Sequence, residues 1–194
     1  MLPLIVDLHN RPVVLIGAGK IGAGKARQLI AAGAELTVIS TAILGDLPDG
    51  ISQLHLRPYQ SGDLAGAFLV VAATGDSTTN DSIVAEAAER NQLLNVVDDP
   101  ARSNFYFTAL HRDGEVSVSV STEGASPALA QWVRDEIRRL LPPGLGDVAH
   151  QLRRERETLH HSGQSTEGRD WRARVRELIG DRLDPAKLSS SPDE

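Results

Sequence analysis

Through residue 100, short runs of apolar residues alternate with segments that are apolar on one side only. The runs are typical of strands buried on both faces, and they lie at 13–16, 36–39, 68–73 and 93–97, with a shorter one near 54–56. Residues 23–32 and a second segment, which Asn80 would cap, repeat apolar residues at helical spacing. Strands that alternate with helices predict a Rossmann-like α/β fold with a parallel sheet.

A glycine-rich turn, GAGKIG at residues 17–22, joins the first predicted strand to the first predicted helix. In this context Gly17, Gly19 and Gly22 permit a tight turn, close approach of a pyrophosphate and close packing of helix on strand. The helix N-terminus directs its free N–H groups at the phosphates. A glycine turn without a ligand is the alternative, but the flanking strand and helix favour a dinucleotide site.

Two further polar turns are expected beside this one, because ligands of such sheets bind outside the carboxyl ends of the strands. Thr74-Gly75-Asp76 and Asp98-Asp99 each follow an apolar run. A carboxylate at Asp98 is suited to act as general acid or base beside a bound nicotinamide. The equal alternative is a turn aspartate that stabilises Asp99-Pro100, and Asp99 has the same two options.

The acidic residue that often follows the second strand of NAD-binding domains is absent. Ser40-Thr41 takes its place, and no arginine stands there to bind a 2′-phosphate. Backbone groups of Thr41 and Ala42 are the candidates to hold the ribose. These residues favour NAD over NADP.

The pattern changes after Pro100. An apolar run at 105–107 and the alternating residues 116–121 flank Asp113-Gly114, which predicts a hairpin. Ser126-Pro127 predicts the start of a helix that ends before Pro142. The apolar residues that this helix would bury are Leu129, Val133, Ile137 and Leu140. So small a unit leaves a face exposed, and a second copy of the chain is its simplest partner.

The loop between hairpin and helix, residues 121–126, is rich in hydroxyl groups. Beside a helix N-terminus it suits the carboxylates of a substrate, although an ordinary capped loop is the commoner interpretation. Two terminal helices are expected at 145–160 and 170–183. The predicted regions are an NAD-binding domain at 1–100, a dimerisation and substrate region at 101–143, a helical region at 144–188 and a tail at 189–194.

Composition narrows the classes of function. The chain has no cysteine, which excludes disulfides and thiolate metal sites and fits a reducing cytoplasm. The net charge of −6 argues against a nucleic-acid partner. The histidines lack metal-ligand spacing, so no metal site is expected. No apolar run approaches the ~20 residues that span a bilayer, and we expect neither a signal peptide nor a membrane partner.

Five groups of residues, in one order and spacing, resemble a known family. They are Leu2-Pro3-Leu4 with Asp7-Leu8 and Arg11; Gly24-Lys25-Ala26-Arg27; Ala72-Ala73-Thr74 with Asn80; Asn95-Val96-Val97-Asp98; and residues 118–122 with 124–130. The family is that of precorrin-2 dehydrogenase, the N-terminal module of siroheme synthase. The resemblance covers about residues 2–150.

This resemblance implies NAD-dependent oxidation of precorrin-2 to sirohydrochlorin, with Asp98 as the catalytic residue. In some members the same site also takes ferrous iron as a substrate and makes siroheme. Thr122 falls where fused bacterial members have a serine that can be phosphorylated, and the family forms an intertwined homodimer. The expected cofactor-binding residues are Gly17, Gly19, Lys20, Ile21, Gly22, Thr41, Ala42, Thr74 and Gly75. The expected substrate-binding residues are Asn95, Ser121, Thr122 and Gly124.

Two other functions remain open from the sequence. One is a regulatory NAD-sensing module, which usually keeps the ribose-binding acid and does not need Asn95-Val96-Val97-Asp98. The other is an oxidoreductase that acts on a different small substrate.

Overall fold

The computed structural model describes residues 1–180, and the chain divides into two compact units. The first unit is Met1–Tyr106, and the second begins at Phe107. The predicted tail at 189–194 and the end of the predicted helix at 170–183 lie outside the described residues. Among the helices of residues 1–180, none is long and apolar enough to cross a membrane.

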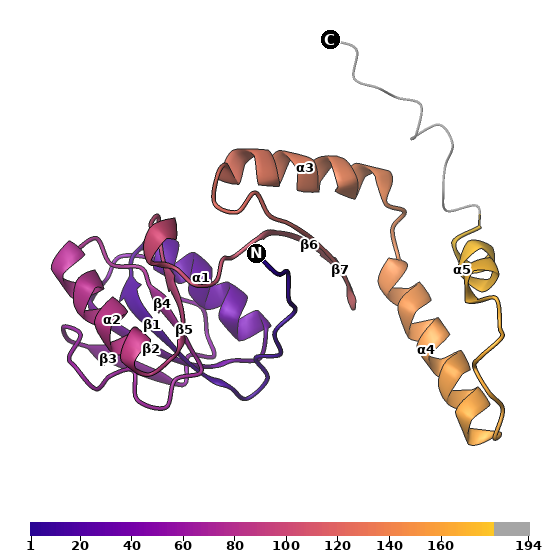
Figure 1. Cartoon of the computed structure of the whole chain (residues 1–194), viewed down its shortest axis with the longest axis horizontal. Helices are drawn as coiled ribbons and strands as arrows, with labels where there is room; N and C mark the ends of the chain where they lie inside the picture. The colour runs from indigo at the N-terminus through magenta and orange to yellow at the C-terminus, as the bar shows by residue number, and fades with distance from the viewer. Residues whose placement is uncertain (181–194) are drawn as a thin grey trace, which may run out of the picture. The chain divides into compact units, whose positions relative to one another are not determined.

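The first unit contains a five-stranded parallel sheet with the order β3-β2-β1-β4-β5 (Figure 1). Its strands are β1 (Pro12–Ala18), β2 (Glu35–Ile43), β3 (Gln53–Leu56), β4 (Leu69–Ala72) and β5 (Leu93–Val96). Its long helices are α1 (Lys20–Ala31) and α2 (Ser77–Glu89), and a short 3₁₀ helix, η1 (Pro100–Arg102), follows β5. The predicted Rossmann-like fold is confirmed. The strand order reverses between β1 and β4, which is where such sheets bind ligands.

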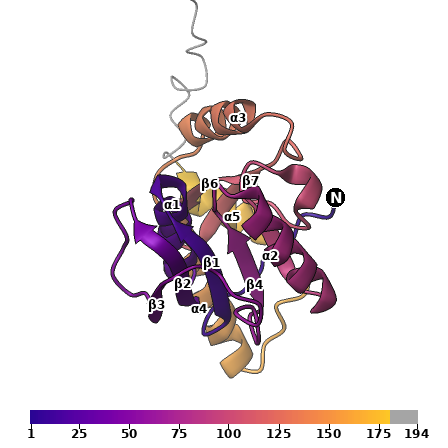
Figure 2. The same cartoon turned by 90° about the vertical axis from the view of Figure 1, so that its left-hand side faces the viewer.

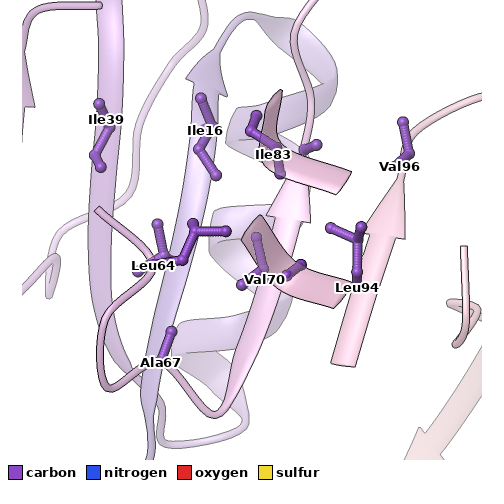
Figure 3. Packing of buried hydrophobic residues seen from close by; sticks show 11 residues of the cluster. Ile16, Ile39, Leu64, Ala67, Val70, Ile83, Leu94 and Val96 are labelled. Atoms are coloured by element: carbon purple, nitrogen blue, oxygen red, sulfur yellow. The ribbon is translucent and has the colours of Figure 1, made fainter. Parts of the chain in front are cut away.

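The two faces of the sheet bury different side chains. On one face Ile16, Val70 and Leu94 come from neighbouring strands and pack with Ile83 of α2 (Figure 3). The residues that alternate with these along each strand point to the other face of the sheet. Helix α1 covers that face, because the crossover from β1 to β2 and the crossover from β4 to β5 run in opposite directions along the sheet and right-handed crossovers then place their helices on opposite sides. The fully buried residues of α1 include Ala26 and Leu29. Asn95 of β5, between Leu94 and Val96, therefore lies on the α1 side of the sheet.

Helix α2 begins one turn earlier than the sequence predicted. The Asp76 carboxylate accepts a hydrogen bond from Thr79 N at 2.8 Å and caps the helix, so the prediction of Asn80 as the cap is wrong. Asn80 lies inside the helix and is buried. Its Oδ1 accepts a hydrogen bond from Thr74 Oγ1 at 2.7 Å, which holds the turn after β4 against α2.

A buried carboxylate on α2 anchors the loop that precedes β4. Glu86 accepts hydrogen bonds from Tyr59 Oη, Gly62 N and Leu64 N at 2.5, 2.9 and 3.2 Å. Burial acts to raise the pKa of Glu86, but these bonds and one from Arg90 favour the charged form and lower its pKa overall. We attribute a structural role to this cluster, because its polar groups satisfy one another.

The second unit holds an antiparallel hairpin of β6 (Ala109–Asp113) and β7 (Val116–Val120), seen in Figure 2. The predicted turn after Asp113 is confirmed, but the prediction that residues 105–107 form its first strand is wrong. The Phe105 carbonyl accepts a hydrogen bond from Asn95 Nδ2 at 3.1 Å, and Tyr106 Oη donates to the Pro100 carbonyl at 2.9 Å. Phe105 and Tyr106 therefore belong to the first unit, and β7 pairs with Ala109–Asp113 instead.

Three helices complete the described part of the second unit: α3 (Pro127–Leu140), α4 (Leu145–His161) and α5 (Trp171–Ile179). Ser126 caps α3 as predicted, since its Oγ accepts a hydrogen bond from Leu129 N at 3.2 Å. The prediction that α3 buries Leu129 and Leu140 does not hold within one chain, where they are 51% and 52% exposed. No other part of the described chain covers that side of α3 enough to bury Leu129 and Leu140.

Candidate functional site

The glycine turn between β1 and α1 is fixed by its own packing. Gly17 has a φ of 101°, and a Cβ there would lie 2.4 Å from the carbonyl oxygen of Ala73, next to the end of β4. A Cβ on Gly22 would lie 2.1 Å from the carbonyl oxygen of Gly17. Both positions therefore require glycine for the fold itself, whether or not a ligand binds.

Gly19 has a different role. It is the N-cap of α1, with a φ of −75° that any residue adopts, and a Cβ there would meet nothing within 4 Å. No side chain caps this end of α1, and Lys20 and Ile21 of its first turn are exposed. Open space in front of uncapped backbone N–H groups at a helix N-terminus fits a pyrophosphate. The turn thus fits the dinucleotide that the sequence predicts, and Gly19 is the position with open space in front of the helix end.

The end of β2 lies beside the glycine turn. The pairing of β1 with β2 shifts between Ile16 and Ala18, and this leaves Thr41 and Ala42 exposed opposite the turn. The Ser40 hydroxyl fixes the irregularity, because it accepts a hydrogen bond from Ala18 N at 3.0 Å and donates one to the Ala42 carbonyl at 2.8 Å. Sequence reasoning treated Ser40 as a missing acid and did not foresee this bracing role.

The segment after β2 closes against the same turn. A Cβ on Gly45 would lie 2.6 Å from the carbonyl oxygen of Gly19, so only glycine fits at this contact. Leu44 N and Gly45 N both donate to the Ala18 carbonyl at 3.0 Å. Gly45 was missed from the sequence, and its only signal was a glycine a few residues beyond the second strand.

On the other side of the turn, Thr74 and Gly75 follow β4. Ala73 N donates to the Ile16 carbonyl at 2.7 Å, so this segment is hydrogen-bonded to β1 just before the glycine turn. A Cβ on Gly75 would meet nothing within 4 Å. The structure therefore brings all the predicted cofactor-binding residues to one edge of the sheet.

The two adjacent aspartates after β5 have different environments. Asp99 caps η1 and accepts hydrogen bonds from Arg102 N at 3.2 Å and Arg102 Nε at 2.5 Å, and the hydrogen bond from the Arg102 side chain lowers the pKa of Asp99. Asp98 is exposed at the same edge of the sheet and has a φ of 61°, in the left-handed region that costs energy for a residue with a Cβ. Asp99 therefore has the turn role, and the catalytic role of Asp98 stays a prediction.

The predicted substrate residues fall in both units. Asn95 is buried on β5, where its amide bonds to Phe105. In the second unit, Ser121 Oγ accepts a hydrogen bond from Glu123 N at 3.1 Å, and Thr122 Oγ1 accepts one from Ser126 N at 3.1 Å and donates to the Ser126 carbonyl. Gly124 turns the loop with a φ of 85°. These hydroxyls shape the loop, and their contact with substrate stays a prediction.

One charged residue near the site was not foreseen. Lys25 lies on α1, three positions after Gly22, and is half-buried. Burial lowers its pKa, and the negative charge of Asp98 acts in the opposite direction. Within residues 1–180, no group of three histidine, aspartate or glutamate side chains is placed to hold a metal ion.

A glycine turn at the strand-order switch point, with an uncapped helix end in front of it, defines a dinucleotide-binding protein. The family model described as putative NAD(P)-binding matches residues 4–109, and the model described as sirohaem biosynthesis protein central matches residues 113–140. The chain belongs to the family of siroheme biosynthesis proteins that contain this NAD(P)-binding domain.

Individual relatives agree with this family. Siroheme synthase of Mannheimia succiniciproducens is 36% identical over 151 residues, which are 76% of this chain and 32% of the relative. Siroheme synthase of Tolumonas auensis is 35% identical over 183 residues, 93% of this chain and 36% of the relative. The chain thus spans about a third of the length of these curated relatives.

A solved structure shares the fold. The protein described as SirC, precorrin-2 dehydrogenase, superposes with a TM-score of 0.71 over 98% of this chain and 94% of its own, at 23% sequence identity. The likeness therefore covers both the sheet-containing unit and the hairpin-plus-helix unit.

Proposed function

We propose that this chain catalyses the NAD-dependent dehydrogenation of precorrin-2 to sirohydrochlorin. The observation that carries the proposal is the exposed carboxylate of Asp98 on a left-handed backbone, at the sheet edge that also holds the glycine turn. The family, the siroheme synthases among the relatives and the fold of SirC support the substrate. A cytoplasmic location belongs to the proposal, and the lack of cysteine supports it.

Dehydrogenation removes a hydride and a proton from the substrate. NAD, when bound, supplies the hydride acceptor. The uncapped N-terminus of α1 binds its pyrophosphate, and the exposed backbone at Thr41 and Ala42 holds a ribose. Asp98 accepts the proton as a general base, and Asn95, Ser121, Thr122 and Gly124 are the proposed substrate-binding residues.

Insertion of ferrous iron into sirohydrochlorin is a second candidate activity of the same site. Iron displaces two protons from pyrrole nitrogens, and the exposed Asp98 carboxylate is suited to accept a proton in that reaction too. Iron is a substrate in this proposal.

Anaerobic incubation of the purified chain with precorrin-2 and NAD tests the function. We expect the absorption of sirohydrochlorin to appear together with an equal amount of NADH. Binding of NAD without turnover would favour a regulatory module. Turnover of NAD with a different small substrate, and none with precorrin-2, would favour another oxidoreductase.

We also propose that the chain forms a homodimer through residues 105–141. The exposed apolar residues Leu129, Trp132 and Leu140 lie on one side of α3, and Leu110 of β6 is 45% exposed. A second copy that covers this side would bury the residues that the sequence predicted to be buried.

Light scattering at micromolar concentration is expected to give twice the mass of the 20.8 kDa chain. Trp132→Glu should yield monomer, because it places a charge within the apolar surface. Leu56→Glu changes an exposed leucine on β3 and should leave the dimer intact. A monomeric parent chain, or an unaltered dimer in the Trp132 variant, would contradict this interface.

A further inference from the structure

Lys25 is an unusual residue for its place in the helix. It lies on α1 one turn from the buried Gly22 and Leu29 and is itself half-buried, so its side chain starts at the margin of the side of α1 that faces the sheet. Side chains of a helix lean towards its N-terminus. The stem of Lys25 therefore leads towards the carboxyl edge of the sheet, where the glycine turn lies.

The first turn of α1 also lies close to the end of β4, the strand that neighbours β5 in the sheet. A Cβ on Gly22 would be 3.6 Å from Ala73 Cβ, at the end of β4. Strand β4 pairs with β5 through Ala72 and Val96, and Val97 N donates to the Ala72 carbonyl at 2.9 Å. Asp98 follows directly, so α1 and the turn after β5 approach the same edge of the sheet.

Two properties of Asp98 make its surroundings important. Its backbone adopts a φ of 61°, in the left-handed region that costs energy for most residues with a Cβ and that aspartate enters more readily than most. Its side chain is exposed, so water alone would leave the carboxylate free to change rotamer. Lys25 supplies an attraction, since the charge of Asp98 acts on its ammonium group.

We propose that Lys25 is a positioning residue, which holds the Asp98 carboxylate at the α1 side of the crevice where the substrate loses its proton. Lys25 is half-buried and its stem starts from a helix, so its side chain has less freedom than that of an exposed lysine and can hold the carboxylate in one direction. The role of Lys25 in the rate rests on the proposed dehydrogenation, whereas its interaction with Asp98 does not.

The interaction is testable without any turnover. The sequence has three lysines, Lys20, Lys25 and Lys187, so ¹³C-dimethylation gives few NMR signals, and Lys25→Arg assigns the relevant one. On α1 the other charged residues, Lys20 and Arg27, are exposed, and Asp98 is the charge that acts on Lys25 from the end of β5. Because that carboxylate raises the pKa of Lys25, Asp98→Asn should lower the pKa further. An identical Lys25 titration in both proteins would refute the interaction.

Kinetics test the consequence for the reaction. Lys25→Met keeps the apolar stem and removes the charge, and we expect kcat to fall about 10-fold or more while NAD affinity and the KM for precorrin-2 stay within about twofold. Lys25→Arg should retain more of the rate than Lys25→Met. In an Asp98→Ala background, Lys25→Met should have no further effect, because the two residues then act as one unit.

A matched control comes from the same helix. Arg27→Met removes an exposed cation whose partner is Asp46, and its rate should stay within about twofold of the parent. If Lys25→Met raised the KM or weakened NAD binding instead of lowering kcat, Lys25 would be a ligand-binding residue and the positioning role would be wrong. If the parent chain did not oxidise precorrin-2 at all, the proposed function would fail, and the NMR titration would still decide whether Lys25 holds Asp98.

Discussion

Replacement of Asp98 by asparagine is expected to lower the rate of sirohydrochlorin formation by about 10²–10⁴-fold, the usual contribution of a general acid or base. Asparagine keeps the shape of the side chain and tolerates the left-handed backbone at a φ of 61°, so the fold and NAD affinity should be unchanged. Alanine should lower the rate equally, with an added small loss of stability from the same backbone conformation. If the chain inserts iron, that rate should fall as well.

Asp99→Ala is the matched control, since it removes the neighbouring carboxylate. It breaks the bonds to Arg102 and the cap of η1, so we expect a lower melting temperature and a rate that recovers on cooling. Steady-state rates at saturating substrate, thermal unfolding and NAD calorimetry separate the two roles. Near-normal turnover in a folded Asp98→Asn protein would rule out the catalytic assignment.

Gly19→Val is expected to weaken NAD binding by more than about tenfold, which is over about 1.4 kcal/mol. The added side chain enters the open space in front of the α1 N-terminus, where the pyrophosphate is proposed to bind, and it meets no protein atom within 4 Å at Cβ. The variant should therefore fold normally. Calorimetry measures the affinity, and thermal unfolding confirms the fold.

Gly24→Val gives a control within the same helix. A Cβ on Gly24 also meets nothing within 4 Å, but Gly24 lies beyond the first turn of α1, so NAD affinity should be retained. Gly17→Val and Gly22→Val should instead lose stability, because each Cβ would overlap a backbone carbonyl. Unchanged NAD affinity in folded Gly19→Val would show that the dinucleotide binds elsewhere.

The sheet and the glycine turn were predictable because both depend on local patterns. Buried strands appear as apolar runs, and the turn of residues 17–22 follows one of them directly. The start of α2 was missed for a local reason, since Asp76 and Asn80 are both good caps and only the structure shows which side chain reaches a free N–H.

Other features depend on contacts that no local pattern contains. The pairing of Phe105 with Asn95, and the interaction of Lys25 with Asp98, join residues from elements that are neighbours only in the folded sheet. The apolar side of α3 was predicted to be buried, but Leu129 and Leu140 are exposed within one chain, and their burial by a second copy stays a prediction. The sequence thus indicated the polar edge of the sheet and the position of Asp98 after β5, and it missed Ser40 and Gly45, whose contacts hold the end of β2 and the glycine turn.

The separate roles of the three glycines affect how such a motif is interpreted in other chains. Selection for folding alone would preserve Gly17 and Gly22, because a methyl group at either position overlaps a backbone carbonyl. Only Gly19 is free of that constraint, so a descendant that no longer bound a dinucleotide would be free to replace it without loss of fold. In proteins that share this turn, the middle glycine is therefore the position whose loss would indicate loss of the cofactor, whereas the outer two would persist in an inactive copy.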